Sequence, residues 1–358
     1  MNAHSAAGNG AVYREILLIR TDRVGDLVLS TPAIASFRRS WPQARIRAVV
    51  TGYTEPVLRH NPDVDEVVLL PHRAPLQAIA QVARLGRTSD IAVGLAPRTD
   101  DIFLAGVTSA QTRLGYVYRR RYLSRALAQL ALTDWCLSEA DPELADRYPD
   151  RPVLHEVRQV LALVQLAGGQ KLTEELTLRL GPDDVAWAKA NAPANAVVLA
   201  LAPRWLARNF GPAAVGRLIT SLAREHEHVI VTYGPDTAEQ ANSIREEIDG
   251  SKVTWLGNLP LLHWAAVLAQ SKVVVTVDTG ATHVAAALKR PVVVVFEREY
   301  FRLCSQEWSP WRVESVMLTK PPSPEHSQPL IEDVVAGVRR LGDAVPSGGS
   351  AVETSGGR

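Results

Sequence analysis

The sequence predicts an α/β protein made of two lobes, each with a parallel sheet covered by helices. Two matching strand–loop–helix units, far apart in the chain, support this prediction. In the first, the apolar run Ile16–Arg20 leads through Thr21–Asp26 into an apolar helix. In the second, Val273–Val277 leads through Asp278–Gly280 into another. Each unit places a glycine and a carboxylate at the carboxyl end of a buried strand, where ligands bind in open α/β sheets. Two such units predict two Rossmann-like lobes whose sheets face a central cleft.

Strand-like and helical stretches alternate along the first half of the chain, as expected of a parallel sheet covered by helices. Pro32 falls inside the first helical stretch, so a break or kink is expected there. The predicted strands lie near 16–20, 46–50, 66–70 and 91–95, and the predicted helices near 27–39, 54–60, 75–85 and 100–106.

A second alternating series follows a helix over 155–167 and a crossover over 171–184. Its strands are expected near 196–201, 228–233, 253–256, 273–277 and 291–296, and its helices near 211–225, 236–248, 261–269 and 281–288. The predicted organisation is a disordered leader over 1–14, an N-terminal lobe over 15–180, a C-terminal lobe over 181–328, a helix over 329–342 packing back towards the N-terminal lobe, and a flexible tail over 343–358.

Composition excludes several classes of protein. The apolar fraction of 46% and charged fraction of 22% are those of an ordinary globular protein, and a net charge of +1 does not favour binding to nucleic acid. Two cysteines, Cys136 and Cys304, argue for a reducing compartment. No apolar stretch approaches the roughly 18–20 residues of a membrane-spanning helix, and the start lacks the apolar core of a secretion signal. We therefore expect a cytoplasmic protein, with peripheral membrane contact possible.

Asp26 is the candidate general base. It follows Gly25 at the first strand-to-helix turn, and a carboxylate there could accept a proton from a substrate hydroxyl if burial raised its pKa. A helix cap or a first-turn acid is the alternative.

The second unit suits an anion, because the free N–H groups of a helix N-terminus bind phosphate. Thr279 and Gly280 are candidate phosphate contacts, and Asp278 is expected to accept bonds from sugar hydroxyls or to cap the helix. His283 could donate to a phosphate or sugar oxygen, or could simply be packed. Arg204 and Arg208 could clamp a diphosphate, with a solvated loop as the alternative.

A cationic region without any acid spans Ile102 to Thr133. Such a field suits an anionic acceptor or an anionic membrane face, although a solvated helix face or an RNA contact would use the same residues. Its arginines are Arg113, Arg119, Arg120, Arg121 and Arg125, interleaved with Tyr116, Tyr118 and Tyr122.

These stretches resemble glycosyltransferase family 9, the lipopolysaccharide heptosyltransferases and their relatives. The resemblance lies in ILLIRTDRVGDLVLSTPAIASFRRSWPQARI near the start and VVVTVDTGATHVAAALKRPVVVVF near the end, with TRLGY, HEVRQVLALVQLAG and RNFGPAAVGRLI between them. It implies the GT-B architecture, with an acceptor-binding N-terminal lobe and a C-terminal lobe that binds the nucleotide sugar.

The resemblance also implies roles for individual residues. Asp26 would be the general base of an inverting transfer of a sugar, with ADP-heptose as the expected donor, onto a lipopolysaccharide-type acceptor at the cytosolic face of the inner membrane. Because positive protein charge can stabilise the departing diphosphate, we expect no obligatory metal or other cofactor. Donor contacts would come from Arg204, Arg208, Glu239, Asp278, Thr279, Gly280 and His283, and acceptor contacts from Arg23, Arg113, Arg119, Arg120 and Arg121.

Two departures from the family pattern bear on the donor. The chain has Phe296-Glu297-Arg298-Glu299 where the family usually has Phe-Gly-Pro-Thr, and Arg208-Asn209-Phe210 in place of Lys-x-Trp. The altered loop at Phe296-Glu297 motivates one alternative, a non-catalytic sugar-nucleotide-binding protein. A sugar-nucleotide epimerase of similar two-lobed fold is the other alternative.

Overall fold

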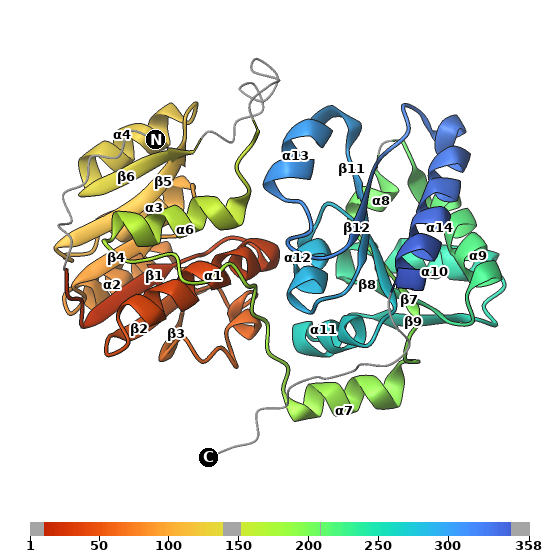
Figure 1. Cartoon of the computed structure of the whole chain (residues 1–358), viewed down its shortest axis with the longest axis horizontal. Coiled ribbons are helices and arrows are strands. Elements are labelled where there is room, and N and C mark those ends of the chain that lie inside the picture. The colour runs from red at the N-terminus through yellow and green to blue at the C-terminus, as the bar shows by residue number, and fades with distance from the viewer. Residues whose placement is uncertain (1–10, 139–151, 208, 345–358) are drawn as a thin grey trace. The chain divides into compact units, whose positions relative to one another are not determined.

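The computed structural model describes residues 11–138, 152–207 and 209–344 (Figure 1). The chain divides into two compact units, Met1–Arg179 and Leu180–Arg358. Each unit contains one parallel sheet of six strands with helices on its faces. The two sheets confirm the predicted α/β fold class.

The sheet of unit 1 has the strand order β3-β2-β1-β4-β5-β6, and every neighbouring pair is parallel. Its strands are β1 Glu15–Ile19, β2 Arg45–Val50, β3 Glu66–Leu69, β4 Ile91–Gly94, β5 Thr112–Tyr118 and β6 Asp134–Ser138. The helices are α1 Val24–Ser40, α2 Pro75–Gly86, α3 Thr99–Gly106, α4 Tyr122–Ala131 and α6 Glu156–Leu166, with a 3-10 turn η1 at Glu55–Val57.

Alternation along the strands divides unit 1 into layers. Leu17 and Ile19 point to one face of β1 and join the core formed with α2, α3 and α4. Their neighbours Ile16 and Leu18 are equally buried and point to the opposite face, where α1 packs on α6. Because both faces are covered, the strands are continuous apolar runs, which is why they could be recognised in the sequence.

The sheet of unit 2 has the order β12-β11-β10-β7-β8-β9 and is again parallel throughout. Its strands are β7 Val197–Leu201, β8 Val229–Tyr233, β9 Val253–Gly257, β10 Val273–Val277, β11 Val292–Phe296 and β12 Ser315–Thr319. The helices are α7 Pro182–Asn191, α8 Pro203–Leu206, α9 Gly211–Glu225, α10 Ala238–Glu247, α11 Leu261–Ala269, α12 Gly280–Ala287, α13 Phe301–Glu307 and α14 Ser327–Ala344, with 3-10 turns η2 Pro235–Thr237, η3 Arg298–Tyr300 and η4 Pro324–His326.

The final helix, α14, packs within unit 2. Its apolar face, which includes Ile331, Val334 and Val338, joins the core of unit 2 with α9 and one face of the sheet. The reason is that this face of β10 and β11 presents valines, which α14 covers.

The N-terminal leader is also shorter than expected. Residues 1–10 lie outside the described part of the chain, as do 345–358 of the expected tail, but Ala11–Arg14 belong to unit 1. Tyr13 is buried against Trp41, with ring centroids 4.9 Å apart, and the indole of Trp41 donates to the Ala11 carbonyl at 2.8 Å. These contacts fix the chain before β1 begins.

Several helices and strands were not predicted from the sequence. The strands β5, β6 and β12 were not predicted, nor were the helices α4, α7, α8 and α13. The arginines and tyrosines of β5 were attributed to a charged surface, while β6 and β12 are edge strands of five residues in which most side chains are only partly buried. Edge strands lack the continuous apolar run of a central parallel strand.

Helix α1 continues through Pro32 without the predicted break. A proline has no N–H, so the carbonyl four residues earlier, that of Val28, loses its helical partner. The Thr31 hydroxyl replaces that partner by donating to the Val28 carbonyl at 2.7 Å, and it accepts from the Thr177 amide at 2.9 Å. The buried Thr31 hydroxyl therefore provides a hydrogen-bond partner for both the Val28 carbonyl and the Thr177 amide.

Replacing Thr31 with valine should lower the free energy of unfolding by about 1–3 kcal/mol, because two buried backbone groups lose their partner. Thr31→Ser keeps the hydroxyl and is the matched control, with a much smaller expected loss. Urea unfolding followed by circular dichroism measures both. A loss in the serine variant equal to that in the valine variant would show that the hydroxyl is not what matters.

None of the helices within the described ranges is long and apolar enough to cross a lipid bilayer.

Candidate functional site

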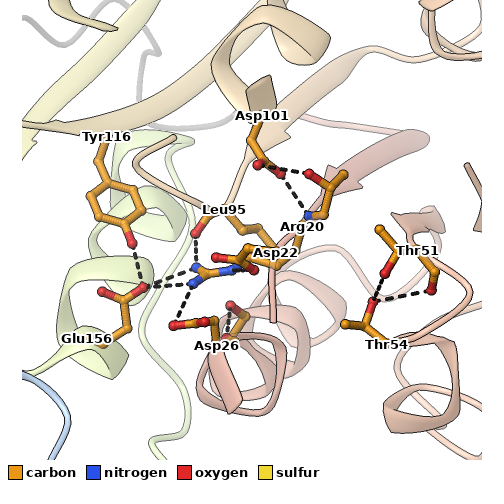
Figure 2. Close-up of polar contacts among 11 residues, drawn as sticks. Arg20, Asp22, Asp26, Thr51, Thr54, Leu95, Asp101, Tyr116 and Glu156 are labelled. Atoms are coloured by element: carbon orange, nitrogen blue, oxygen red, sulfur yellow. Dashed lines mark hydrogen bonds and ion pairs between the residues drawn. The ribbon is translucent and has the colours of Figure 1, made fainter. Parts of the chain in front are cut away.

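The candidate site of unit 1 is built around a buried arginine at the carboxyl end of β1. Arg20 directly follows the strand, and its side chain is only 2% exposed. Its guanidinium donates from Nε to Asp22 at 2.8 Å and from both terminal nitrogens to Glu156 Oε1 at 3.1 Å (Figure 2). Nη1 also donates to the carbonyl of Leu95, at the end of β4. One arginine therefore ties three segments of unit 1 to the sheet edge.

Asp26 lies beside this arginine in the first turn of α1 (Figure 2). Its Oδ1 is 3.5 Å from Arg20 Nη2, and 23% of its side chain is exposed. Burial raises the pKa of Asp26 to about 7, with the charge of Arg20 opposing the rise and Asp22 and Glu156 adding to it. A carboxylate that titrates near neutrality and remains accessible suits a general base.

Glu156 and Tyr116 complete the contacts to Arg20. The Tyr116 hydroxyl donates to Glu156 Oε1 at 2.5 Å, and both side chains are buried. Burial raises the pKa of Glu156, against the attraction of Arg20, and burial together with Glu156 holds the pKa of Tyr116 well above its usual range. Burial tends to lower the pKa of Arg20, but the surrounding acids raise it well above its usual value. The guanidinium is therefore a permanent positive charge.

Asp101 fixes the loop between β1 and α1. Its carboxylate accepts from the Thr21 amide at 2.9 Å and from the Thr21 hydroxyl at 3.1 Å. Burial, with a smaller contribution from Asp22, raises the pKa of Asp101 to about 7. Because Asp101 is fully buried, it positions the loop rather than meeting a substrate.

Arg20, Asp22 and Glu156 were missed as site residues in the sequence. Arg20 ends an apolar strand at the edge where ligands bind, and a charge in that position was an available signal. Glu156 had no such signal. It reaches Arg20 across 136 positions of sequence because α6 packs on α1.

The structure splits the arginine cluster. Arg119, Arg120 and Arg121 follow β5 and are exposed at the same sheet edge as Asp26, and Arg23 is exposed just before α1. Arg113 lies near the amino end of β5, where its guanidinium donates to the carbonyls of Ala110 at 2.7 Å and Ala131 at 2.8 Å. About five residues of strand, roughly 17 Å, separate it from the other end. The expectation that Arg113 shares an acceptor site with the other arginines is therefore corrected: its contacts are structural.

In unit 2 the candidate donor residues gather at the carboxyl edge of the sheet. Arg204 follows β7, and its Nη1 donates to the Asp278 carboxylate at 2.5 Å and to the Asp278 carbonyl at 2.8 Å. Asp278 follows β10, and burial, together with this acid, raises the pKa of the nearby Cys304 thiol to about 12. The contact between Arg204 and Asp278 joins two segments that the sequence had indicated separately as candidate donor contacts.

The remaining donor candidates lie around the start of α12 and of α10. Thr279 precedes Gly280 at the N-terminus of α12, and its hydroxyl donates to the Val277 carbonyl at 3.2 Å. His283 is buried in the first turn, which favours a packed position. Glu239 is exposed in the first turn of α10, which follows β8 at the same edge. Arg208 lies outside the described residues.

Within the ranges that the structure describes, no group of three or more His, Cys, Asp or Glu side chains is arranged to hold a metal ion.

Similarity to known proteins extends over most of the chain. The model of glycosyltransferase family 9 (heptosyltransferase) matches residues 143–329, more than half of the chain. Lipopolysaccharide heptosyltransferase 3 of Escherichia coli is 22% identical over 305 residues, which cover 80% of this chain and 83% of that protein. The family 9 glycosyltransferase structure from Veillonella parvula has a TM-score of 0.73 at 16% identity, covering 93% of this chain and 98% of that one. The E. coli ADP-heptose lps heptosyltransferase II structure has a TM-score of 0.67 at 18% identity, covering 91% and 99%.

The family match confirms the resemblance found in the sequence and favours a transferase over an epimerase or a non-catalytic binding protein. The solved structures share the fold of two Rossmann-like units. The chain therefore belongs to glycosyltransferase family 9, the heptosyltransferases, and is a glycosyltransferase.

Proposed function

We propose that this protein is an inverting glycosyltransferase that moves a sugar from a nucleoside diphosphate, with ADP-heptose as the donor, to a lipopolysaccharide-core acceptor. The observation that supports this most directly is the state of Asp26. It is partly exposed at the sheet edge, and its pKa lies near 7. In this mechanism Asp26 removes the proton of the acceptor hydroxyl as the oxygen attacks the anomeric carbon.

The donor is assigned to unit 2. Arg204, with Arg208, supplies positive charge to the diphosphate, and the amides of Thr279 and Gly280 at the start of α12 add hydrogen-bond donors. Asp278 and Glu239 accept bonds from sugar and ribose hydroxyls, and His283 supports the turn. Positive protein charge stabilises the departing diphosphate, so the proposal requires no obligatory metal.

The acceptor is assigned to unit 1. Arg23, Arg119, Arg120 and Arg121 are exposed at the edge that holds Asp26, and their charge suits the phosphates and carboxylates of an anionic glycolipid. The proposed location is the cytosolic face of the inner membrane, with peripheral contact through this edge. No nucleic-acid partner enters the proposal.

The test is a transfer assay with purified protein, a lipopolysaccharide-core acceptor and a panel of ADP-, UDP-, GDP- and dTDP-sugars. We expect acceptor-dependent release of ADP from ADP-heptose, with the new bond of inverted anomeric configuration. Isomerisation of a donor without acceptor would support an epimerase instead. Release of no diphosphate from any donor would contradict the proposal.

The pH dependence of kcat/KM should report the ionisation of Asp26 directly. Only the ionised carboxylate accepts a proton, and its pKa is about 7, so kcat/KM should rise about tenfold per pH unit below that value and level off above it. Asp101 has a similar pKa but no proposed contact with substrate. The acid limb should therefore persist in Asp101→Asn, and its loss in that variant would assign the titration to Asp101.

A further inference from the structure

A buried lysine lies beside the departure from the family pattern at Glu297. Lys320 follows β12, and its side chain is only 2% exposed. Its ammonium nitrogen lies 2.9 Å from Glu297 Oε1, donates to the Ala207 carbonyl at 3.0 Å, and donates to the Arg204 carbonyl. An ammonium group has three N–H donors, and these three acceptors match them. The buried charge is thus both neutralised and hydrogen-bonded, as burial requires.

Strand register explains why this pair forms. β11 and β12 are parallel, with Phe296 opposite Thr319, and the Lys320 amide donates to the Phe296 carbonyl at 2.9 Å. The next residues, Glu297 and Lys320, are therefore neighbours at the carboxyl edge of the sheet. A glycine at 297 would leave Lys320 without a counterion, so the two residues depend on each other.

These contacts hold Arg204 both at its main chain and at its guanidinium group. Lys320 binds its main-chain carbonyl, and Asp278 binds its Nη1. Within the described residues, the side-chain hydrogen bonds and the ion pair of Arg204 are all made by Nη1, and 44% of the side chain is exposed. The guanidinium is fixed in place with donors remaining for an anion.

We propose that Lys320, with Glu297 as its counterion, is a positioning residue that holds Arg204 ready for the donor diphosphate. The inference rests on the proposed function, because it takes the diphosphate to be the ligand of Arg204. It also gives Glu297 a role: by neutralising Lys320, Glu297 helps to hold Arg204 in the position that binds the diphosphate. Fixing a donor group in its bound geometry before binding increases affinity by removing the entropic cost of ordering it.

The experiment measures ADP affinity by calorimetry in the full chain for wild type, Lys320→Met, Arg204→Ala and the double variant. Lys320→Met should weaken ADP binding about tenfold and raise donor KM to match, with acceptor KM unchanged. In the Arg204→Ala background the same change should have no further effect, because coupled residues are not additive. Arg339→Met is the matched control: this arginine pairs with Glu225 at 2.9 Å elsewhere on unit 2, and its loss should leave ADP affinity unchanged.

Unchanged ADP affinity in a folded Lys320→Met, or a full additional loss in the double variant, would overturn the positioning role. If Lys320→Met does not fold, Glu297→Gln is measured in the same cycle; it keeps an acceptor and removes only the charge, and should weaken ADP binding at least about threefold. Wild-type protein that binds ADP but transfers no sugar would contradict the proposed function alone. Wild-type protein that binds none of ADP, UDP, GDP and dTDP would overturn both.

Discussion

Asp26→Asn is expected to lower kcat at least about 100-fold while leaving ADP affinity unchanged. General-base catalysis supplies about that factor, and an amide cannot accept the proton of the acceptor hydroxyl. The substitution is close to isosteric, so the packing of α1 should survive. Single-turnover transfer with saturating donor measures the chemical step, and calorimetry with ADP measures the donor site.

Asp100→Asn is the matched control for this experiment. Like Asp26, Asp100 is a first-turn helix acid in unit 1, but it is largely exposed, and its ion pair is with Arg98 at 3.3 Å. Both variants lose the favourable interaction of a carboxylate with a helix N-terminus, which is worth about 0.3–1 kcal/mol. Only Asp26→Asn should lose turnover. Transfer within about tenfold of wild type would leave Asp26 as a helix-terminal acid and remove it from the mechanism.

The parts of the site that the sequence predicted are those set by local order. A turn that follows a buried strand lies at the carboxyl edge of a parallel sheet, so Asp26, Asp278 and Thr279 could be placed from their neighbours alone. Arg204 followed from the same argument. The central strands β1, rich in leucine and isoleucine, and β10, rich in valine, were recognisable because both of their faces are buried.

The parts that escaped prediction depend on contacts across long stretches of sequence. Glu156 meets Arg20 only because α6 packs on α1, and Lys320 meets Glu297 only through the register of β11 and β12. No spacing in the chain encodes either pair. Arg113 shows the converse error: proximity in sequence suggested a cluster, but a strand separates it from Arg119.

Arg20→Met should have the second large effect, on stability and on the titration of Asp26 together. Asp22, Asp26 and Glu156 would lose their shared positive charge, and removing one partner of a buried ion pair costs about 3–5 kcal/mol. Without Arg20, which opposes the rise, the pKa of Asp26 should lie above 7, and the acid limb of kcat/KM should shift to higher pH.

The sign of the stability change with pH follows from the same groups. Asp26 and Glu156 have pKa values raised above those of the unfolded chain, so the native state binds more protons between about pH 4 and 7, and stability falls as pH rises through that window. Removing Arg20 strengthens this trend. The loss caused by Arg20→Met should therefore be larger at pH 8 than at pH 5, which urea unfolding at the two pH values measures.

Two further variants separate a role of Arg20 in positioning Asp26 from a purely structural one. Arg20→Lys keeps the charge but cannot reach Asp22, Glu156 and the Leu95 carbonyl together, so it should restore part of the pH profile and little of the stability. Arg45→Met removes an exposed partner of Glu66, at 2.9 Å, and should cost no more than about 1 kcal/mol. If Arg20→Met were destabilised but kept the wild-type midpoint of kcat/KM, Arg20 would serve the fold alone. A shifted midpoint that lysine partly restores would show that the buried guanidinium sets the proton affinity of Asp26.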